Sequence, residues 1–134
     1  MKVVIIGGGI AGMATAILLR KKGIDFSLNE REESLPKFGH AFLIHPDAME
    51  ILDVISEVNP DIELPGKIID RIVMKRPDNS IVQISELDSW ICIQRLRIIE
   101  FLTSFLGVEQ IKFDRQFSHF IYDVDNATAA VFTN

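Results

Sequence analysis

The pattern of apolar and polar positions changes twice within the first thirty residues. Val3–Ile6 is a short run of apolar, β-branched residues, typical of a strand buried on both faces in the middle of a parallel sheet. Residues 11–22 are good helix formers that end in three cations, where a helix dipole favours positive charge, and Gly23 is placed to cap them. Residues 25–29 alternate like a second strand. The pattern predicts a βαβ unit of about thirty residues.

Two further stretches have the apolar spacing of amphipathic helices. Residues 38–52 lead through a glycine-containing loop into a helix with Pro46 in its first turn. The turn-forming clusters at residues 59–60 and 64–66 are expected to end this helix. Residues 90–95 then lead into a helix over residues 96–106 that Gly107 stops. The predicted buried positions are Met49, Ile51, Leu52 and Ile55 in the first helix, and Ile98, Ile99, Leu102, Phe105 and Leu106 in the second.

Between and after these helices the pattern is that of strands. The turn at residues 76–79 predicts a β excursion that interrupts the α/β order, and a polar stretch at residues 123–126 predicts a second hairpin. One short run is expected to return to the parallel sheet. The expected strands of this part are residues 67–75, 80–85, 111–113, 116–122 and 127–132.

Composition limits the classes of protein that fit this pattern. The chain has 134 residues, 48% of them apolar and 25% charged, which suits one packed domain. A net charge of -5 with scattered basic residues disfavours a nucleic-acid partner. The lone Cys92 forms no internal disulfide, which suits a reducing compartment. We therefore expect an α/β fold, a single Rossmann-like domain over residues 1–134, without an integral membrane segment and in the cytoplasm.

The glycines between the first strand and the first helix carry the candidate chemistry. Their spacing is Gly7-x-Gly9-x-x-Gly12. In such a motif the first glycine permits a tight turn, the second lets the backbone approach a pyrophosphate, and the third lets helix and strand pack closely. A phosphate would rest on the free amides at the helix start, which need no basic side chain. A secretion signal is the competing interpretation of this apolar run, but consecutive glycines weaken the helix that a signal needs.

An acidic residue stands where a dinucleotide site needs one. Glu30 follows the second predicted strand, eighteen positions after Gly12, where its carboxylate can accept both hydroxyls of an adenosine ribose. The same geometry disfavours a 2'-phosphate, although the neighbouring Arg31 weakens that exclusion. Glycines and acid together indicate a dinucleotide site, but they do not separate nicotinamide from flavin dinucleotides, because both contain the ADP half.

Three motifs in combination resemble the flavoprotein monooxygenases similar to p-hydroxybenzoate hydroxylase, including the flavin enzymes that hydroxylate tetracyclines. They are the glycine motif with Glu30-Arg31, residues 39–52 matching the family's glycine loop and helix start, and Arg95-x-x-Ile98-x-x-x-Leu102 matching its Arg-x-x-Leu-x-x-x-Leu helix. Ala41 and Asp47 depart from the family's usual glycine and asparagine. The family's Asp-Gly and Gly-Asp flavin motifs and its substrate domain do not occur before Asn134, so we expect an N-terminal portion of a longer enzyme.

The resemblance implies FAD as cofactor and NAD(P)H as reductant. Oxygen would then add to the flavin C4a carbon, and the hydroperoxide would hydroxylate a small organic substrate. The implied positions are Gly7, Gly9, Ile10, Ala11 and Gly12 at the pyrophosphate, Glu30 and Arg31 at the ribose, Gly39 and His40 near the flavin entrance, and Arg95 at the phosphate or ribityl chain. No side chain is expected to act as a catalytic nucleophile, and no metal site is expected.

Several alternatives stay open at this point. A halogenase or a polyprenyl reductase would use the same nucleotide-binding start, and a nicotinamide-dependent dehydrogenase shares its ADP-binding half. A non-catalytic nucleotide-binding fragment is another alternative. Because half a sheet exposes apolar edges, such a chain is also expected to form homo-oligomers through them.

Overall fold

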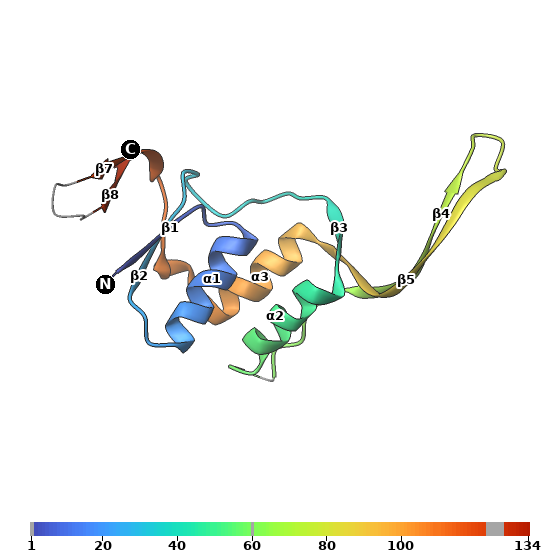
Figure 1. Cartoon of the computed structure of the whole chain (residues 1–134), viewed down its shortest axis with the longest axis horizontal. Helices are drawn as coiled ribbons and strands as arrows, with labels where there is room; N and C mark the ends of the chain where they lie inside the picture. Colours follow the sequence, from blue (N-terminus) through green and yellow to red (C-terminus); the bar gives the residue numbers. More distant parts are fainter. Residues whose placement is uncertain (1, 60, 123–127) are drawn as a thin grey trace. The chain divides into compact units, whose positions relative to one another are not determined.

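The computed structural model describes residues 2–59, 61–122 and 128–134, and its elements are shown in Figure 1. The chain divides into two compact units. Unit 1 comprises Met1–Lys37 and Ile99–Asn134, and unit 2 comprises Phe38–Ile98. The predicted α/β class is confirmed, with a parallel sheet in unit 1 and an antiparallel excursion in unit 2.

Unit 1 contains the predicted βαβ unit. β1 (Val3–Ile6) and β2 (Phe26–Asn29) pair in parallel, and α1 (Ile10–Lys21) connects them. β6 (Ile111–Lys112) joins β2 in parallel, so the strand order is β1-β2-β6. The predicted return of residues 111–113 to the parallel sheet is therefore confirmed, and a 3-10 turn, η1 (Val108–Gln110), precedes it.

The position of β1 differs from the prediction. β1 lies at an edge of the three strands rather than in the middle. Ile5 is buried, whereas Val4 and Ile6 are 43% and 45% exposed. Side chains alternate across a strand, so the residues beside Ile5 face the opposite side of the sheet from it. The prediction of a strand buried on both faces is wrong for the part of the chain that the structure describes, because an apolar run does not say what covers its second face.

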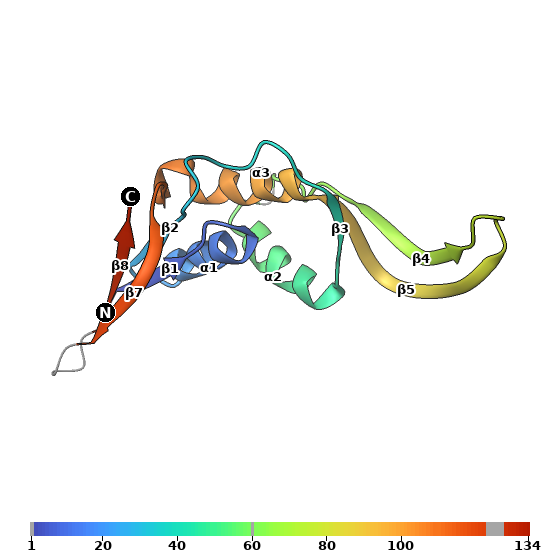
Figure 2. The ribbon, with the colours of Figure 1, turned by 90° about the horizontal axis from the view of Figure 1, so that it is seen from above.

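The core of unit 1 lies between α1 and the end of α3 (Arg95–Leu106), which run side by side in Figure 2. Met13 and Ile17 of α1 are fully buried, and the Thr103 hydroxyl lies 3.7 Å from the Met13 sulfur. The predicted apolar stripe of α3 is confirmed. Its buried members are Ile98, Ile99, Leu102, Phe105 and Leu106.

Arg20 ties the end of α1 to the end of α3. Its guanidinium donates to the carbonyl of Leu106 at 3.0 Å and to that of Phe105. The last carbonyls of a helix have no partners within the helix, and a cation there also opposes the negative end of the dipole. We expect Arg20→Met to lower the free energy of unfolding by about 1 to 2 kcal/mol, measured by urea denaturation. Lys22→Met, a change of the same kind at an exposed neighbour, is the control, and an equal loss in both variants would contradict this assignment.

The C-terminal hairpin of unit 1 is also confirmed. β7 (Gln116–Tyr122) pairs antiparallel with β8 (Thr128–Thr133), with Phe117 opposite Phe132. The predicted turn at residues 123–126, and residue 127 with which the second strand was expected to begin, lie outside the described residues.

Unit 2 contains more strand than the sequence predicts. β5 (Ile81–Gln94) pairs with β4 (Lys67–Lys75) on one side and with β3 (Ala41–Ile44) on the other. The sequence pattern predicts a loop at residues 41–44 and an end of the second strand at residue 85. Both assignments are wrong. The end of β5 pairs with β3, as in the opposition of Ala41 to Gln94, and local periodicity contains no information on a pairing so distant along the chain.

The first helix of unit 2, α2 (Pro46–Ser56), begins at the predicted proline. His45 is its N-cap, and its Nδ1 accepts from the Asp47 amide at 3.2 Å, while its ring packs edge-on against Trp90. Of the predicted stripe, Leu52 and Ile55 are buried and Met49 is half-buried. Ile51 is 47% exposed, so its assignment to the buried face is wrong. The predicted end at residues 59–60 is near the observed end, although residue 60 lies outside the described residues.

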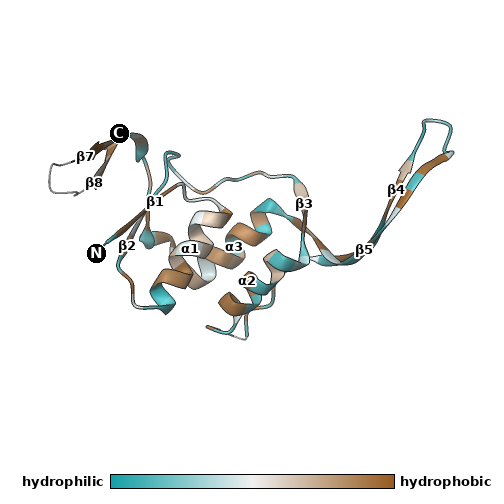
Figure 3. Cartoon of the chain, in the orientation of Figure 1, coloured by the Kyte–Doolittle hydropathy of each residue, from teal (hydrophilic) through white to brown (hydrophobic). Residues whose placement is uncertain are grey.

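The β4–β5 ribbon ends in a tight turn. Asn79 has a left-handed backbone (φ 67°), and the Asp78 carboxylate accepts hydrogen bonds from the Ser80 hydroxyl and amide. These bonds hold the pKa of Asp78 below its ordinary value, the hydroxyl making the larger contribution. Figure 3 marks hydrophobic residues of β5 in brown. Apolar residues are exposed on both strands, namely Ile68, Ile72, Val73, Met74, Ile81, Val82 and Ile84. Among the described residues, no helix combines the length and the apolar character that crossing a membrane requires.

Candidate functional site

The glycine turn between β1 and α1 has the backbone geometry that its spacing predicts. Gly7 has a left-handed backbone (φ 102°), and its amide donates to the Asn29 carbonyl at 2.7 Å. A Cβ on Gly12 would lie 1.9 Å from the Gly7 carbonyl oxygen and 3.3 Å from Leu28 Cδ1. Gly7 is therefore required by its backbone conformation, and Gly12 is required by the close approach of α1 to the end of β1.

The start of α1 is open. Gly9 is the N-cap, in an extended conformation (φ -77°, ψ -170°), and no side chain caps the helix. A Cβ on Gly9 would meet no protein atom within 4 Å. The first turn, with Ile10 and Ala11, carries no acidic residue. Amides at a helix start lack partners within the helix and sit at the positive end of its dipole, so this opening has the space and the charge that an anionic group needs.

Glu30 lies directly beside the glycine turn. Its Oε2 accepts from the Gly8 amide at 2.6 Å, and its Oε1 accepts from the Glu32 amide at 3.0 Å. The side chain is half-buried. A carboxylate has about four acceptor positions, so these two bonds leave capacity for two hydroxyl groups. The carboxylate is thus oriented before any ligand arrives. The sequence spacing predicted correctly that Glu30 lies beside the glycines. It did not indicate the hydrogen bond that the Gly8 amide donates to Glu30.

Arg31, the other residue predicted to contact the ribose, forms an ion pair with Glu32. Its Nε lies 3.2 Å from Glu32 Oε1, and the two side chains are 73% and 66% exposed. Exposed pairs of this kind contribute little to stability, so Arg31 stays free to take another partner.

The remaining three predicted site residues come together in unit 2. The Arg95 amide donates to the His40 carbonyl at 3.0 Å. A Cβ on Gly39 would lie 2.9 Å from the Arg95 Cβ and 3.5 Å from its Cγ and Cδ, so the stem of Arg95 packs on a position that only glycine leaves free. The predicted site residues therefore form two groups, one in each unit: Gly7, Gly9, Ile10, Ala11, Gly12, Glu30 and Arg31 in unit 1, and Gly39, His40 and Arg95 in unit 2.

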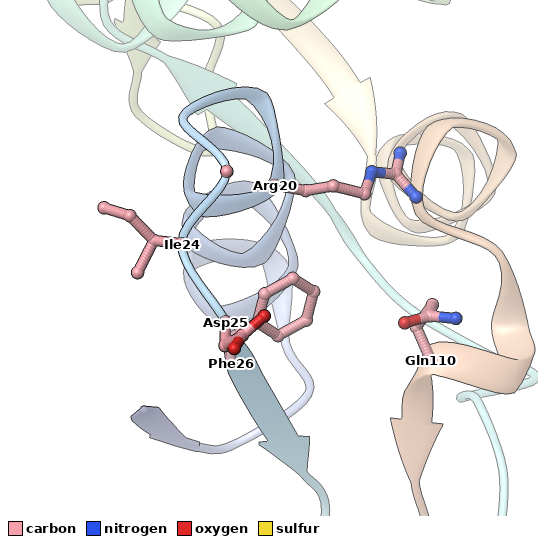
Figure 4. A pocket seen from close by; sticks show the side chains of 6 residues that line it. Arg20, Ile24, Asp25, Phe26 and Gln110 are labelled. Atoms are coloured by element: carbon pink, nitrogen blue, oxygen red, sulfur yellow. The ribbon is translucent and has the colours of Figure 1, made fainter. Parts of the chain in front are cut away.

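A shallow hollow of about 280 Å³ lies elsewhere in unit 1 (Figure 4). Arg20, Asp25, Phe26 and Gln110 line it together with Gly23 and Ile24. Apart from Gln110, which ends η1, these residues lie between the end of α1 and the beginning of β2, whereas the glycine turn lies at the opposite ends of both elements. In addition, the Arg20 guanidinium is engaged with α3. The hollow is thus separate from the glycine turn. No cluster of side chains suited to a metal ion occurs in the ranges that the structure describes.

The fold defines a Rossmann-like βαβ unit with a glycine turn and an acid after its second strand. Comparison with known proteins finds a match over residues 1–58 to the family described as FAD binding domain. The predicted resemblance to FAD-dependent flavoprotein monooxygenases is confirmed.

The chain is also similar to a curated monooxygenase and, in fold, to solved structures. The chain is 30% identical, over 91 residues, to the FAD-dependent monooxygenase atnA of an Arthrinium species, covering 67% of this chain and 12% of that protein. The structure of Klebsiella pneumoniae HpxO complexed with FAD and uric acid has a TM-score of 0.75 at 17% identity, over 97% of this chain and 37% of that one.

The tetracycline destructase Tet(51) has a TM-score of 0.67 at 25% identity, over 98% of this chain and 34% of that one. The chain thus spans about a third of these structures and much less of the curated relative.

Proposed function

We propose that this chain is the FAD-binding portion of a flavin-dependent monooxygenase, forming one FAD/NAD(P)-binding domain over residues 1–134. The observation that carries the proposal is the arrangement at the start of α1. There an uncapped helix N-terminus opens beside Gly9, and the Glu30 carboxylate is held next to it by the Gly8 amide. An anion site and a hydroxyl acceptor side by side suit the pyrophosphate and ribose of an ADP moiety.

Each residue of the two groups takes a role in this proposal. The turn from Gly7 to Gly12, with the Ile10 and Ala11 amides, would hold the pyrophosphate. Glu30 would accept the ribose hydroxyls, and Arg31, once released from Glu32, would lie beside them. Gly39 and His40 would line the flavin entrance. Arg95, whose stem packs on Gly39, would reach the phosphate or ribityl chain.

The bound flavin would supply the redox chemistry, with NAD(P)H as reductant and oxygen as co-substrate, for hydroxylation of a small organic substrate. The residues of this chain would bind and orient the cofactor rather than act on the substrate. HpxO, one of the structural relatives, was crystallised with uric acid, which supports a substrate of small size. We also propose a cytoplasmic location and self-association through exposed sheet edges such as β1, where Val4 and Ile6 are exposed. Light scattering of the purified chain would test the self-association.

The role of Glu30 gives a direct test. Glu30→Ala removes the acceptor for the ribose hydroxyls, and we expect the dissociation constant for FAD or ADP to rise roughly tenfold, as for a lost pair of hydrogen bonds to a charged group. Isothermal titration calorimetry measures this change. Glu33→Ala is the matched control, since Glu33 is an exposed acid three positions further on. Unchanged affinity in Glu30→Ala would remove Glu30 from the site.

A further inference from the structure

Backbone hydrogen bonds join the segment after β2 to the segment after β6. The Glu30 amide donates to the Lys112 carbonyl at 2.9 Å, and the Arg115 amide donates back to the Glu30 carbonyl at 2.8 Å. The Asp114 amide donates to the Glu32 carbonyl at 3.2 Å. The loop that carries Glu30 is therefore fixed at Glu30 and Glu32 by residues far away in the sequence.

Asp114, which donates one of these hydrogen bonds, has an unusual backbone conformation. Its φ of 54° lies in the left-handed region, which few residues other than glycine adopt and which aspartate tolerates better than most. The turn there brings two successive amides, of Asp114 and Arg115, to two carbonyls of the Glu30 loop. Backbone strain of this kind persists where surrounding structure imposes it, and it concentrates at functional sites.

Glu32 connects this turn to the Glu30 carboxylate. Its carbonyl accepts from Asp114, and its amide donates to Glu30 Oε1. The other carboxylate oxygen is held by Gly8. A shift of the Asp114 turn would therefore move Glu32 and release one of the two bonds that orient the carboxylate. A carboxylate oriented in advance loses less conformational freedom on binding than a mobile one.

We propose that Asp114 is a positioning residue that pre-orients Glu30 for the hydroxyls of a ribose. The inference rests on the proposed function, since it concerns the same adenosine site. Asp114 acts through backbone geometry and the Glu32 amide rather than by touching the ligand. Its side chain is exposed, so the position matters through its φ angle rather than through its charge.

The test compares ADP with 2'-deoxy-ADP by calorimetry on the full chain. The dissociation constant of the wild-type chain for ADP should be lower than that for 2'-deoxy-ADP by at least about fivefold. A factor of this size is expected for one hydrogen bond from a hydroxyl to a charged acceptor. Asp114→Val, whose β-branched side chain disfavours the left-handed region, should weaken ADP binding by a similar factor and bring the ratio close to one. Asp114→Asn, which keeps that conformation accessible, should retain the wild-type ratio.

Two controls make the result specific. Asn79→Val places the same substitution at another left-handed position, in the β4–β5 turn, and should leave the ratio unchanged. In a Glu30→Ala background, Asp114→Val should cause no further loss, because residues acting through one another are not additive. Should Asp114→Val fail to fold by circular dichroism, Asp114→Ala carries the same test with a milder strain.

The possible results separate the two proposals. A wild-type ratio retained in Asp114→Val, or an additive loss on top of Glu30→Ala, would overturn the positioning role while leaving the adenosine site intact. Absence of ADP binding by the wild-type chain would instead overturn the proposed function, and with it the inference.

Discussion

Gly12→Ala is expected to be the most damaging single substitution in unit 1. The added Cβ would lie 1.9 Å from the Gly7 carbonyl oxygen, a backbone atom, so either α1 or the end of β1 must move. Overpacking in a close-packed region costs about 3 kcal/mol, a large part of the 5 to 15 kcal/mol that usually stabilises a domain. The urea midpoint measured by circular dichroism should fall accordingly.

Gly9→Ala provides the comparison for that loss. A Cβ on Gly9 meets no protein atom within 4 Å, so the same chemical change three positions earlier should cost no more than about 1 kcal/mol, the range of a helix N-cap preference. Equal midpoints for the Gly12 and Gly9 variants would contradict the close approach of helix and strand described here.

Gly9→Val is expected to have the largest effect on binding. Because the Gly9 backbone is extended, valine adopts it without strain, and the side chain would project into the opening at the start of α1. The affinity for FAD and for ADP should fall by at least about tenfold, which corresponds to 1.4 kcal/mol. The urea midpoint should fall no more than in Gly9→Ala, because the protein has no atoms there to displace.

Thr15→Val is the matched control for Gly9→Val. It introduces the same side chain at an exposed position of α1, one turn after Ala11. The hydroxyl it removes bonds to the Ala11 carbonyl and not to an amide of the glycine turn, so the dissociation constant should stay unchanged. A Gly9→Val variant that binds FAD as tightly as wild type would show that the opening is not the pyrophosphate site.

Local chemistry made the first thirty residues predictable. The β-branched run, the glycine spacing and the cations at the helix end specify β1, the turn and α1 through interactions between near neighbours in the sequence. The same holds for α3, whose five predicted apolar positions are all buried. Glu30 followed from its spacing after Gly12, and the structure has its carboxylate beside the glycine turn.

The features that sequence reasoning missed depend on contacts between distant residues. Residues 41–44 form β3 by pairing with residues 91–94, and the second half of β5 also pairs with β4 at residues 90–92. The exposure of Val4, Ile6 and Ile51 depends on what covers them, which no local pattern records. The bond from Gly8 to Glu30 and the bonds from Asp114 and Arg115 to the Glu30 loop join strand ends that only the assembled sheet brings together.

The most direct test of the central claim is an amide NMR titration of the chain with ADP, the part of FAD that the βαβ unit would hold. We expect saturable shifts confined to the amides of the turn from Gly7 to Gly12 and to Glu30 and Glu32. The absence of saturable shifts in these amides, or shifts centred instead on the hollow lined by Arg20 and Gln110, would contradict the proposed dinucleotide site.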